Sequence, residues 1–199
     1  MRSRRSLTAL TALTALAAVG IAVLAGCAAV PAPQGAPASS ATHDVLADHG
    51  LAGLTAVEVI DVLDRVAVSE RPTTLIASVR PDALVLEDER GETSLPLPDD
   101  LAYVSIAPYV EQTHECHFHS LTTCQGELSR EPVRVTITDA SGAVIVDEST
   151  QTFDNGFVGY WLPRDLRGSI EIEHAGMTGV ATLSTSADAP TCITTLALR

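Results

Sequence analysis

The spacing of apolar residues predicts a short helical stretch followed by a longer series of strands. Asp44 to Asp48 favours a small helix that stops at Gly50, and Thr55-x-x-Glu58 forms a capping box ahead of a second helix. In that second helix the apolar residues recur near helical spacing, at Val59, Ile60, Leu63 and Val66. Residues 43 to about 70 are therefore expected to be helical.

From Leu75 onward the pattern changes to the alternation typical of half-buried strands. The expected strands are 75–79, 83–87, 93–97, 101–107, 133–137, 144–146, 157–162, 169–173, 178–184 and 193–198. Turn residues such as Glu89-Arg90-Gly91 separate them, which favours a mainly antiparallel β-sandwich. The expected fold is α+β: residues 43–98 form a helical N-terminal part with a β-hairpin, and residues 99–199 form a β-sandwich domain.

The N-terminus is typical of an export signal. A basic segment, Arg2 to Arg5, precedes an apolar run from Leu7 to Ala25. The run ends in Leu24-Ala25-Gly26-Cys27, which resembles the lipobox of bacterial lipoprotein precursors.

This resemblance implies that residues 1–26 are a signal peptide and that Cys27 becomes the lipidated N-terminus. Residues 27–42, rich in Ala, Pro and Ser, would then tether the folded body to the membrane surface. The alternative is an uncleaved transmembrane helix, because the apolar run comes close to the length of a span. Both interpretations place the body outside the cytoplasm, facing the periplasm or the cell exterior.

The net charge of the chain indicates which classes of ligand it can bind. All 12 basic residues are Arg, against 25 acidic residues, so the formal net charge is −13. Without residues 1–26, nine Arg face 25 acidic residues and the net charge is −16. Such a surface attracts cations. An acidic chain without basic runs argues against binding to nucleic acid, because phosphate contacts need clustered Lys or Arg.

The stretch from Tyr109 to Arg130 carries the candidate chemistry. It holds three of the six His and two of the four Cys, in the run His114-Glu115-Cys116-His117-Phe118-His119-Ser120-Leu121-Thr122-Thr123-Cys124. In an extended chain His117 and His119 share a face, whereas in a helical turn Cys116 and His119 do. Thiolate and imidazole are the ligands that suit Cu(I) and Zn(II), rather than Mg²⁺ or Ca²⁺.

The cysteine count leaves an odd number of thiols. Lipidation uses Cys27, so Cys116, Cys124 and Cys192 remain. One interpretation is a structural disulfide, either Cys116–Cys124 or Cys124–Cys192, with one idle thiol. The other is that all three cysteines act together, as metal ligands or redox partners.

The run from Cys116 to Glu127 resembles the signature of the CueP-type periplasmic copper-binding proteins. Tyr103 to Tyr109, Thr152 to Phe157 and Pro190-Thr191-Cys192 resemble the same family, so the similarity extends from about Asp44 to Arg199. The resemblance implies copper resistance and copper delivery, a helical N-terminal part that forms a dimer, and a β-sandwich. It also implies that Cys116, Cys124 and Cys192 bind and reduce copper.

The sequence therefore predicts a copper-binding lipoprotein. We expect Cu(I) to be held by two or three of Cys116, Cys124 and Cys192, with His117 or His119, and Zn(II) to be a possible substitute. Two thiols can reduce Cu(II) and close as a disulfide, with Cys116 and Cys124 the nearest pair in sequence and Cys192 able to replace either. This reaction is stoichiometric rather than enzymatic unless a thiol reductase intervenes.

Two other functions remain open at this point. One is a thiol–disulfide redox protein in which Cys116 and Cys124 exchange with a partner, although the chain lacks a C-x-x-C motif. The other is a binding module stapled by a disulfide, with no metal. The expected partners are a copper ion, the membrane, a copper-accepting protein and a reductase.

Overall fold

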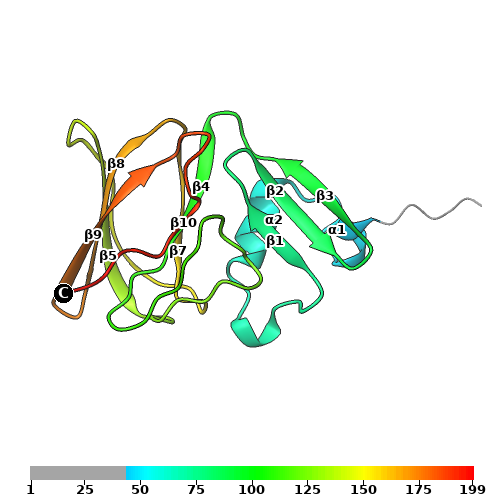
Figure 1. The fold of residues 1–199 in the computed structure, drawn as a ribbon, viewed down its shortest axis with the longest axis horizontal. Helices are drawn as coiled ribbons and strands as arrows, with labels where there is room; N and C mark the ends of the chain where they lie inside the picture. Colours follow the sequence, from blue (N-terminus) through cyan, green and yellow to red (C-terminus); the bar gives the residue numbers. More distant parts are fainter. Residues whose placement is uncertain (1–43) are drawn as a thin grey trace, which may run out of the picture. The chain divides into compact units, whose positions relative to one another are not determined.

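The computed structural model describes residues 44–199 (Figure 1). The predicted signal peptide, lipidated Cys27 and tether lie outside these described residues. Among the described residues, no helix is long and apolar enough to cross a membrane. The helical segments are α1 (Val45–Asp48), α2 (Ala56–Leu63) and a 3₁₀ turn, η1 (Val68–Glu70).

Both predicted helix starts are confirmed by their caps. The Asp44 side chain accepts hydrogen bonds from the backbone N–H groups of Leu46 and Ala47 at the start of α1. Ahead of α2, the Glu58 N–H donates to Thr55 Oγ1 at 3.3 Å, and the Thr55 N–H donates to a Glu58 carboxylate oxygen at 2.8 Å. This is the reciprocal capping box, which satisfies two amides that the helix cannot. Helix α2 ends at Leu63, and its C-cap residue is Asp64.

A three-stranded antiparallel sheet lies against these helices. Its strands are β1 (Ile76–Val79), β2 (Ala83–Asp88) and β3 (Gly91–Pro96), in the order β1-β2-β3. The hairpin predicted around Glu89-Arg90-Gly91 is confirmed by the pairing of β2 with β3. Val59 and Ile60 of α2 share a fully buried core with Leu84 and Leu86 of β2. Burial of such side chains stabilises the fold by about 1.5–3 kcal/mol each.

The rest of the chain forms two further sheets. One has the order β10-β4-β7, from β10 (Cys192–Ile193), β4 (Leu101–Ile106) and β7 (Val158–Pro163). The other has the order β6-β5-β8-β9, from β6 (Val144–Gln151), β5 (Pro132–Asp139), β8 (Arg167–His174) and β9 (Met177–Ser184). Side chains of both sheets meet in one apolar core. A mainly antiparallel β fold behind a small helical part is confirmed, whereas the sandwich arrangement stays a prediction.

The last predicted strand, 193–198, is wrong for most of its length. Only Cys192 and Ile193 pair, in parallel with Ser105 and Ile106 of β4. Beyond them Ala197 makes a single bridge to Tyr109. The alternation in this stretch reflects burial instead: Leu196 and Leu198 point into the core although the backbone forms no continuous ladder. Parallel pairing to β4 matters for function, because it brings Cys192 from the end of the chain to the segment that follows β4.

Candidate metal centre

The loop between β4 and β5 is fixed in place by backbone hydrogen bonds. The His119 carbonyl accepts from the Val79 N–H at 2.8 Å, and the Leu121 N–H donates to the Ala77 carbonyl at 2.8 Å, so the loop pairs with β1. Its other side meets the β10 end of the chain, where the Thr191 N–H donates to the His117 carbonyl at 2.9 Å. The loop is therefore held between the N-terminal sheet and the C-terminal segment.

Thr191 tightens the same junction with its side chain. Its hydroxyl accepts from the His119 N–H at 3.0 Å and donates to the Val79 carbonyl at 2.6 Å. All three residues are buried. Since a buried backbone group without a partner is costly, these bonds set the position of His119.

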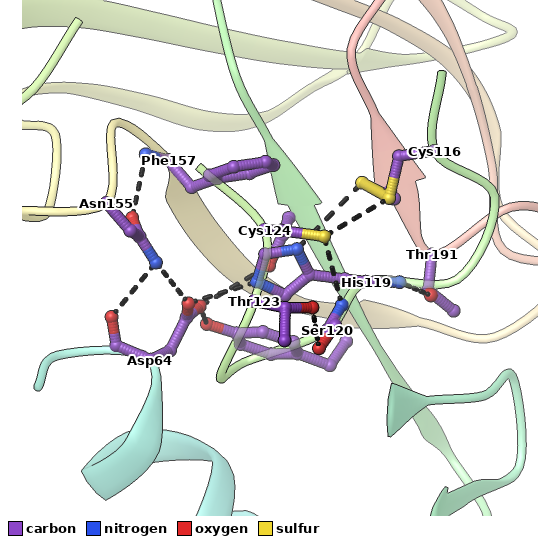
Figure 2. A network of polar contacts seen from close by, with 12 residues as sticks. Asp64, Cys116, His119, Ser120, Thr123, Cys124, Asn155, Phe157 and Thr191 are labelled. Carbon is purple, nitrogen blue, oxygen red and sulfur yellow. Dashed lines mark hydrogen bonds and ion pairs between the residues drawn. A yellow bond between two sulfur atoms is a disulfide. The ribbon is translucent and has the colours of Figure 1, made fainter. Parts of the chain in front are cut away.

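The sulfur atoms of Cys116 and Cys124 in this loop lie close together (Figure 2), and a third sulfur comes from Cys192 of β10. Cys116 and Cys192 form a disulfide, and Cys124 is a free thiol whose Sγ lies 3.5 Å from Cys116 Sγ. The pairing expected from proximity in sequence, Cys116 with Cys124, is therefore not the one observed. Neither is the alternative structural pair Cys124–Cys192. The register of β10 on β4 overrides separation along the chain, because it brings Cys192 to Cys116 across 76 residues.

His119 is completely buried and forms an ion pair with a carboxylate from the helical part. Its Nε2 lies 3.1 Å from Asp64 Oδ1, and its Nδ1 lies 3.9 Å from Cys192 Sγ (Figure 2). Asp64 is itself 1% exposed. The imidazole therefore presents one nitrogen to a carboxylate and the other to sulfur, the arrangement in which a second partner orients a metal-binding histidine.

A network of hydrogen bonds holds Asp64 in turn. Tyr103 donates its hydroxyl to Asp64 Oδ2 at 2.7 Å, and the Asn155 amide donates to Asp64 Oδ1 at 2.8 Å. Asn155 also accepts from the Phe157 N–H at 2.9 Å. Buried charges persist only when they are paired and hydrogen-bonded, a condition that Asp64 meets.

Burial and hydrogen bonding shift the pKa values of this group in opposite directions. Burial disfavours the imidazolium, but the hydrogen bonds to Asp64 and Cys124 prevail and raise the pKa of His119 to about 9. Burial also disfavours the charged form of Asp64, yet its hydrogen bond to His119 and the positive charge there hold the Asp64 pKa below its usual value. Both shifts favour the ionic form of the pair at neutral pH.

Cys124 lies in an environment that favours its thiolate. Burial acts to raise the thiol pKa, but the hydrogen bond and positive charge of His119, the Ser120 N–H and the charge of Arg71 together lower it. The Ser120 N–H lies 3.3 Å from Cys124 Sγ, and Arg71 Nη1 donates to the Cys124 carbonyl at 2.7 Å. Because the thiolate is the nucleophile and the metal ligand, this environment favours both kinds of chemistry.

The ligand atoms form two groups that share one cysteine. In the first, a ring nitrogen of His119 and the sulfur atoms of Cys124 and Cys192 lie within 4.8 Å of one another. In the second, His114 takes the place of His119 and Cys116 that of Cys192, within the same distance. The predicted ligands Cys116, Cys124, Cys192 and His119 are thus brought together.

His117 is not brought to the centre. Its side chain is exposed and packs against the Phe118 ring, with the ring centroids 4.5 Å apart. The segment that holds it is neither the regular strand nor the helical turn considered from the sequence. Its carbonyl, rather than its imidazole, serves the site by accepting hydrogen bonds from Thr191 and Cys192.

Sequence reasoning missed two residues of the site. Asp64 follows α2 and is separated from His119 by 55 residues, so no local pattern indicated it. His114 belongs to the same His- and Cys-rich run as the predicted ligands, so its proximity in sequence was a usable signal. What the sequence could not indicate is which of the three histidines of that run face the sulfur atoms.

Known proteins are similar to this chain in sequence and in fold. The family model of the periplasmic copper-binding protein CueP matches residues 58–197, a span that includes the three cysteines of the cluster. A crystal structure of S.CueP has a TM-score of 0.73 and 44% sequence identity, covering 77% of this chain and 94% of that chain. The comparison with curated proteins finds no match. The chain therefore belongs to the CueP family of periplasmic copper-binding proteins.

Proposed function

We propose that this protein binds Cu(I) outside the cytoplasm through His119, Cys124 and Cys192, in the service of copper resistance or copper delivery. The observation that carries the proposal is the convergence of one imidazole nitrogen and two sulfur atoms within 4.8 Å, beside a buried carboxylate. Soft sulfur and imidazole ligands select Cu(I), and they also accept Zn(II), which is the expected substitute.

Asp64 supports the choice of His119 Nδ1 as the copper ligand. When copper takes Nδ1, the proton that remains on the ring sits on Nε2 and donates to Asp64, 3.1 Å away. The carboxylate thereby fixes the tautomer and the orientation of the ring. The proton that leaves Nδ1 is released on binding, so the affinity for copper depends on pH.

The same cluster is suited to reduce Cu(II). In the fully reduced protein, two thiols give one electron each to two Cu(II) ions, release two protons and form one S–S bond. Cys116 and Cys192 are the pair that the oxidised structure joins. Their oxidation leaves Cys124 and His119 to hold one Cu(I), and the second Cu(I) is released to an acceptor or chelator. The reaction stops when the thiols are used, so the protein acts as a stoichiometric reductant rather than an enzyme.

Thiol–disulfide exchange is a second candidate function, favoured by the short distance between the Cys124 thiol and the disulfide. Cys124 Sγ lies 3.5 Å from Cys116 Sγ, and its thiolate can attack that sulfur. A Cys116–Cys124 bond then forms, the Cys116–Cys192 bond breaks, and Cys192 leaves as a thiolate, with no net oxidation. The new disulfide joins two partly exposed residues rather than the buried Cys192, which offers an external thiol reductase a more accessible substrate.

We also propose that Cys27 carries a lipid that attaches the protein to the membrane. It is supported by the lipobox-like sequence and by the uncharged tether of residues 28–42. A lipidated protein would act at the membrane surface rather than diffuse freely, so its copper acceptor would have to reach that surface. The dimer implied by the family resemblance remains a prediction.

An anaerobic titration tests this function. Cu(II) is added to the fully reduced protein, Cu(I) is followed with a colorimetric chelator, and disulfides are mapped by mass spectrometry. We expect two thiols to disappear for every two Cu(II) ions reduced, with Cys116–Cys192 as the first disulfide. A variant with Ser at Cys116, Cys124 and Cys192 is the blank. If the wild type forms no more Cu(I) than this blank and binds none, the proposed function is wrong.

A further inference from the structure

His114 has a feature that the proposed copper site does not use. Its Nε2 atom is buried from solvent and has no hydrogen-bond partner among residues 44–199. Buried polar atoms are nearly always satisfied, so an unpartnered ring nitrogen calls for a ligand. Independently, one of the two His114 ring nitrogens lies within 4.8 Å of the sulfur atoms of Cys116 and Cys124, a donor set that suits a soft metal ion.

We propose that His114, Cys116 and Cys124 form a second, outer Cu(I) site through which copper leaves the inner site of His119, Cys124 and Cys192. This proposal rests on the proposed function, because it requires Cu(I) to occupy the inner site first. The occupant of both sites is the same ion at successive stages.

The shared ligand makes the passage possible. Cys124 belongs to both groups, so copper can exchange His119 and Cys192 for His114 and Cys116 while it stays bound to one thiolate throughout. A soft ion such as Cu(I) is transferred at low cost when each new sulfur or imidazole ligand arrives before an old one departs. No electron moves in this step, and the ion never has to be released into water.

The two groups differ in how far an external acceptor can reach them. His119 and Cys192 of the inner site are buried, with 0% and 2% exposure. His114 and Cys116 are partly exposed, and both line a pocket of about 360 Å³. An acceptor that supplies its own soft ligands could approach His114 and Cys116 through this pocket, whereas His119 and Cys192 are covered by the fold.

Two glutamates line the pockets next to the outer site. Glu115 lines the same pocket as His114 and Cys116, and Glu127 lines a neighbouring pocket of about 460 Å³ that also includes His114. These carboxylates stabilise a cation in transit. The Glu127 carboxylate also accepts hydrogen bonds from the N–H groups of Val110, Glu111 and Gln112, which fixes the chain that leads to His114.

The Cys116–Cys192 disulfide determines whether the inner and the outer Cu(I) site are complete. Cys116 belongs to the outer group and Cys192 to the inner one, so closing their bond removes one thiolate from each. Complete sites therefore exist only in the reduced protein, and transfer between them is restricted to that state. The test accordingly uses fully reduced protein under anaerobic conditions.

Histidine variants separate the two sites. Protein loaded with one Cu(I) is mixed with excess water-soluble Cu(I) chelator, and the rate of transfer is recorded beside the equilibrium affinity. We expect His114→Ala to slow transfer at least about fivefold while the affinity changes less than about threefold, because the inner site still holds the ion. We expect His119→Ala to lower the affinity at least about tenfold.

His117→Ala is the matched control, because His117 lies on the same loop but in neither ligand group. It should transfer copper at the wild-type rate. His114→Gln, which keeps a polar side chain but is a poor Cu(I) ligand, should behave like His114→Ala, and this second variant guards against misfolding of the first. If wild type binds Cu(I) tightly and both His114 variants transfer it as fast as His117→Ala, the outer site is refuted while the proposed function stands.

Discussion

The two sides of Cys124 are built in different ways. On the buried side, His119 is fixed by strand β1, by Thr191 beside β10, and by Asp64 at the end of α2. On the exposed side, His114 and Cys116 lie in irregular chain, and the Cys116–Cys192 disulfide cross-links this stretch to β10. A preorganised site binds tightly and a less constrained one releases easily, so the difference matches retention on one side and release on the other.

Removing the cysteine shared by both sides should have the largest effect. We expect Cys124→Ser to weaken Cu(I) binding at least about a hundredfold, equivalent to about 2.7 kcal/mol, because neither ligand group survives. Cys192→Ser removes a ligand from the inner group only and should cost about tenfold. Competition against a Cu(I) chelator measures both. Equal losses in the two variants would contradict a shared role for Cys124.

The buried side can be weakened selectively through Asp64. Asp64→Asn keeps the shape of the side chain but removes the charge that orients His119, so we expect a loss of about 10-fold in Cu(I) affinity. The thermal midpoint of the copper-free protein should fall too, because a buried ion pair loses one partner. The matched control is Asp61→Asn, an exposed position on the same helix. An Asp64→Asn affinity equal to that of the control would show that the carboxylate plays no part.

The buried His119–Asp64 ion pair should make the free energy of unfolding and the affinity for Cu(I) depend on pH in opposite directions. The pKa of His119 rises on folding from 6.5 to about 9, so its contribution to stability is complete below pH 6.5 and is lost as pH rises through about 9. Copper competes with that same proton, so Cu(I) affinity should increase over this interval. Thermal midpoints and chelator titrations from pH 6 to 9.5 measure the two trends. In His119→Ala the decline in stability between pH 6.5 and 9 should disappear.

The smallest effect on Cu(I) affinity is expected at His117, the predicted ligand whose side chain faces solvent. His117→Ala removes an exposed imidazole whose ring contacts Phe118, while the backbone carbonyl that accepts from Thr191 and Cys192 remains. Copper affinity should stay within about twofold of wild type. A tenfold loss would place His117 among the ligands and remove the distinction between the buried and exposed sides.

Local patterns predicted most of the fold. The capping box at Thr55 and Glu58 and the hairpin at Glu89-Arg90-Gly91 are decided by neighbours in sequence, and both were correctly predicted. The strand predicted over 193–198 was wrong for most of its length, because Leu196 and Leu198 alternate to fill the core without a continuous partner strand. Alternation records which side chains are buried, and a ladder requires a neighbouring backbone as well.

The ligand types of the site were predictable from the sequence, but the long-range contacts among its residues were not. The His- and Cys-rich run identified the loop and the ligand types, because thiolates and imidazoles at such density have few other uses. The disulfide partner of Cys116 and the role of Asp64 depend on contacts across 76 and 55 residues, which no local pattern records. The choice of His119 over His117 depends on which way the loop turns against β1.

X-ray absorption spectroscopy at the copper edge tests the central claim most directly. Each reduced protein is loaded with one Cu(I), and the spectrum of His114→Ala is compared with that of the double variant His114→Ala, His119→Ala, so that His114 supplies no nitrogen in either. We predict a shell of two sulfur atoms and one imidazole nitrogen in His114→Ala, from Cys124, Cys192 and His119, and a shell without that nitrogen in the double variant. A shell of nitrogen and oxygen alone in His114→Ala, or a nitrogen signal unchanged in the double variant, would contradict the account.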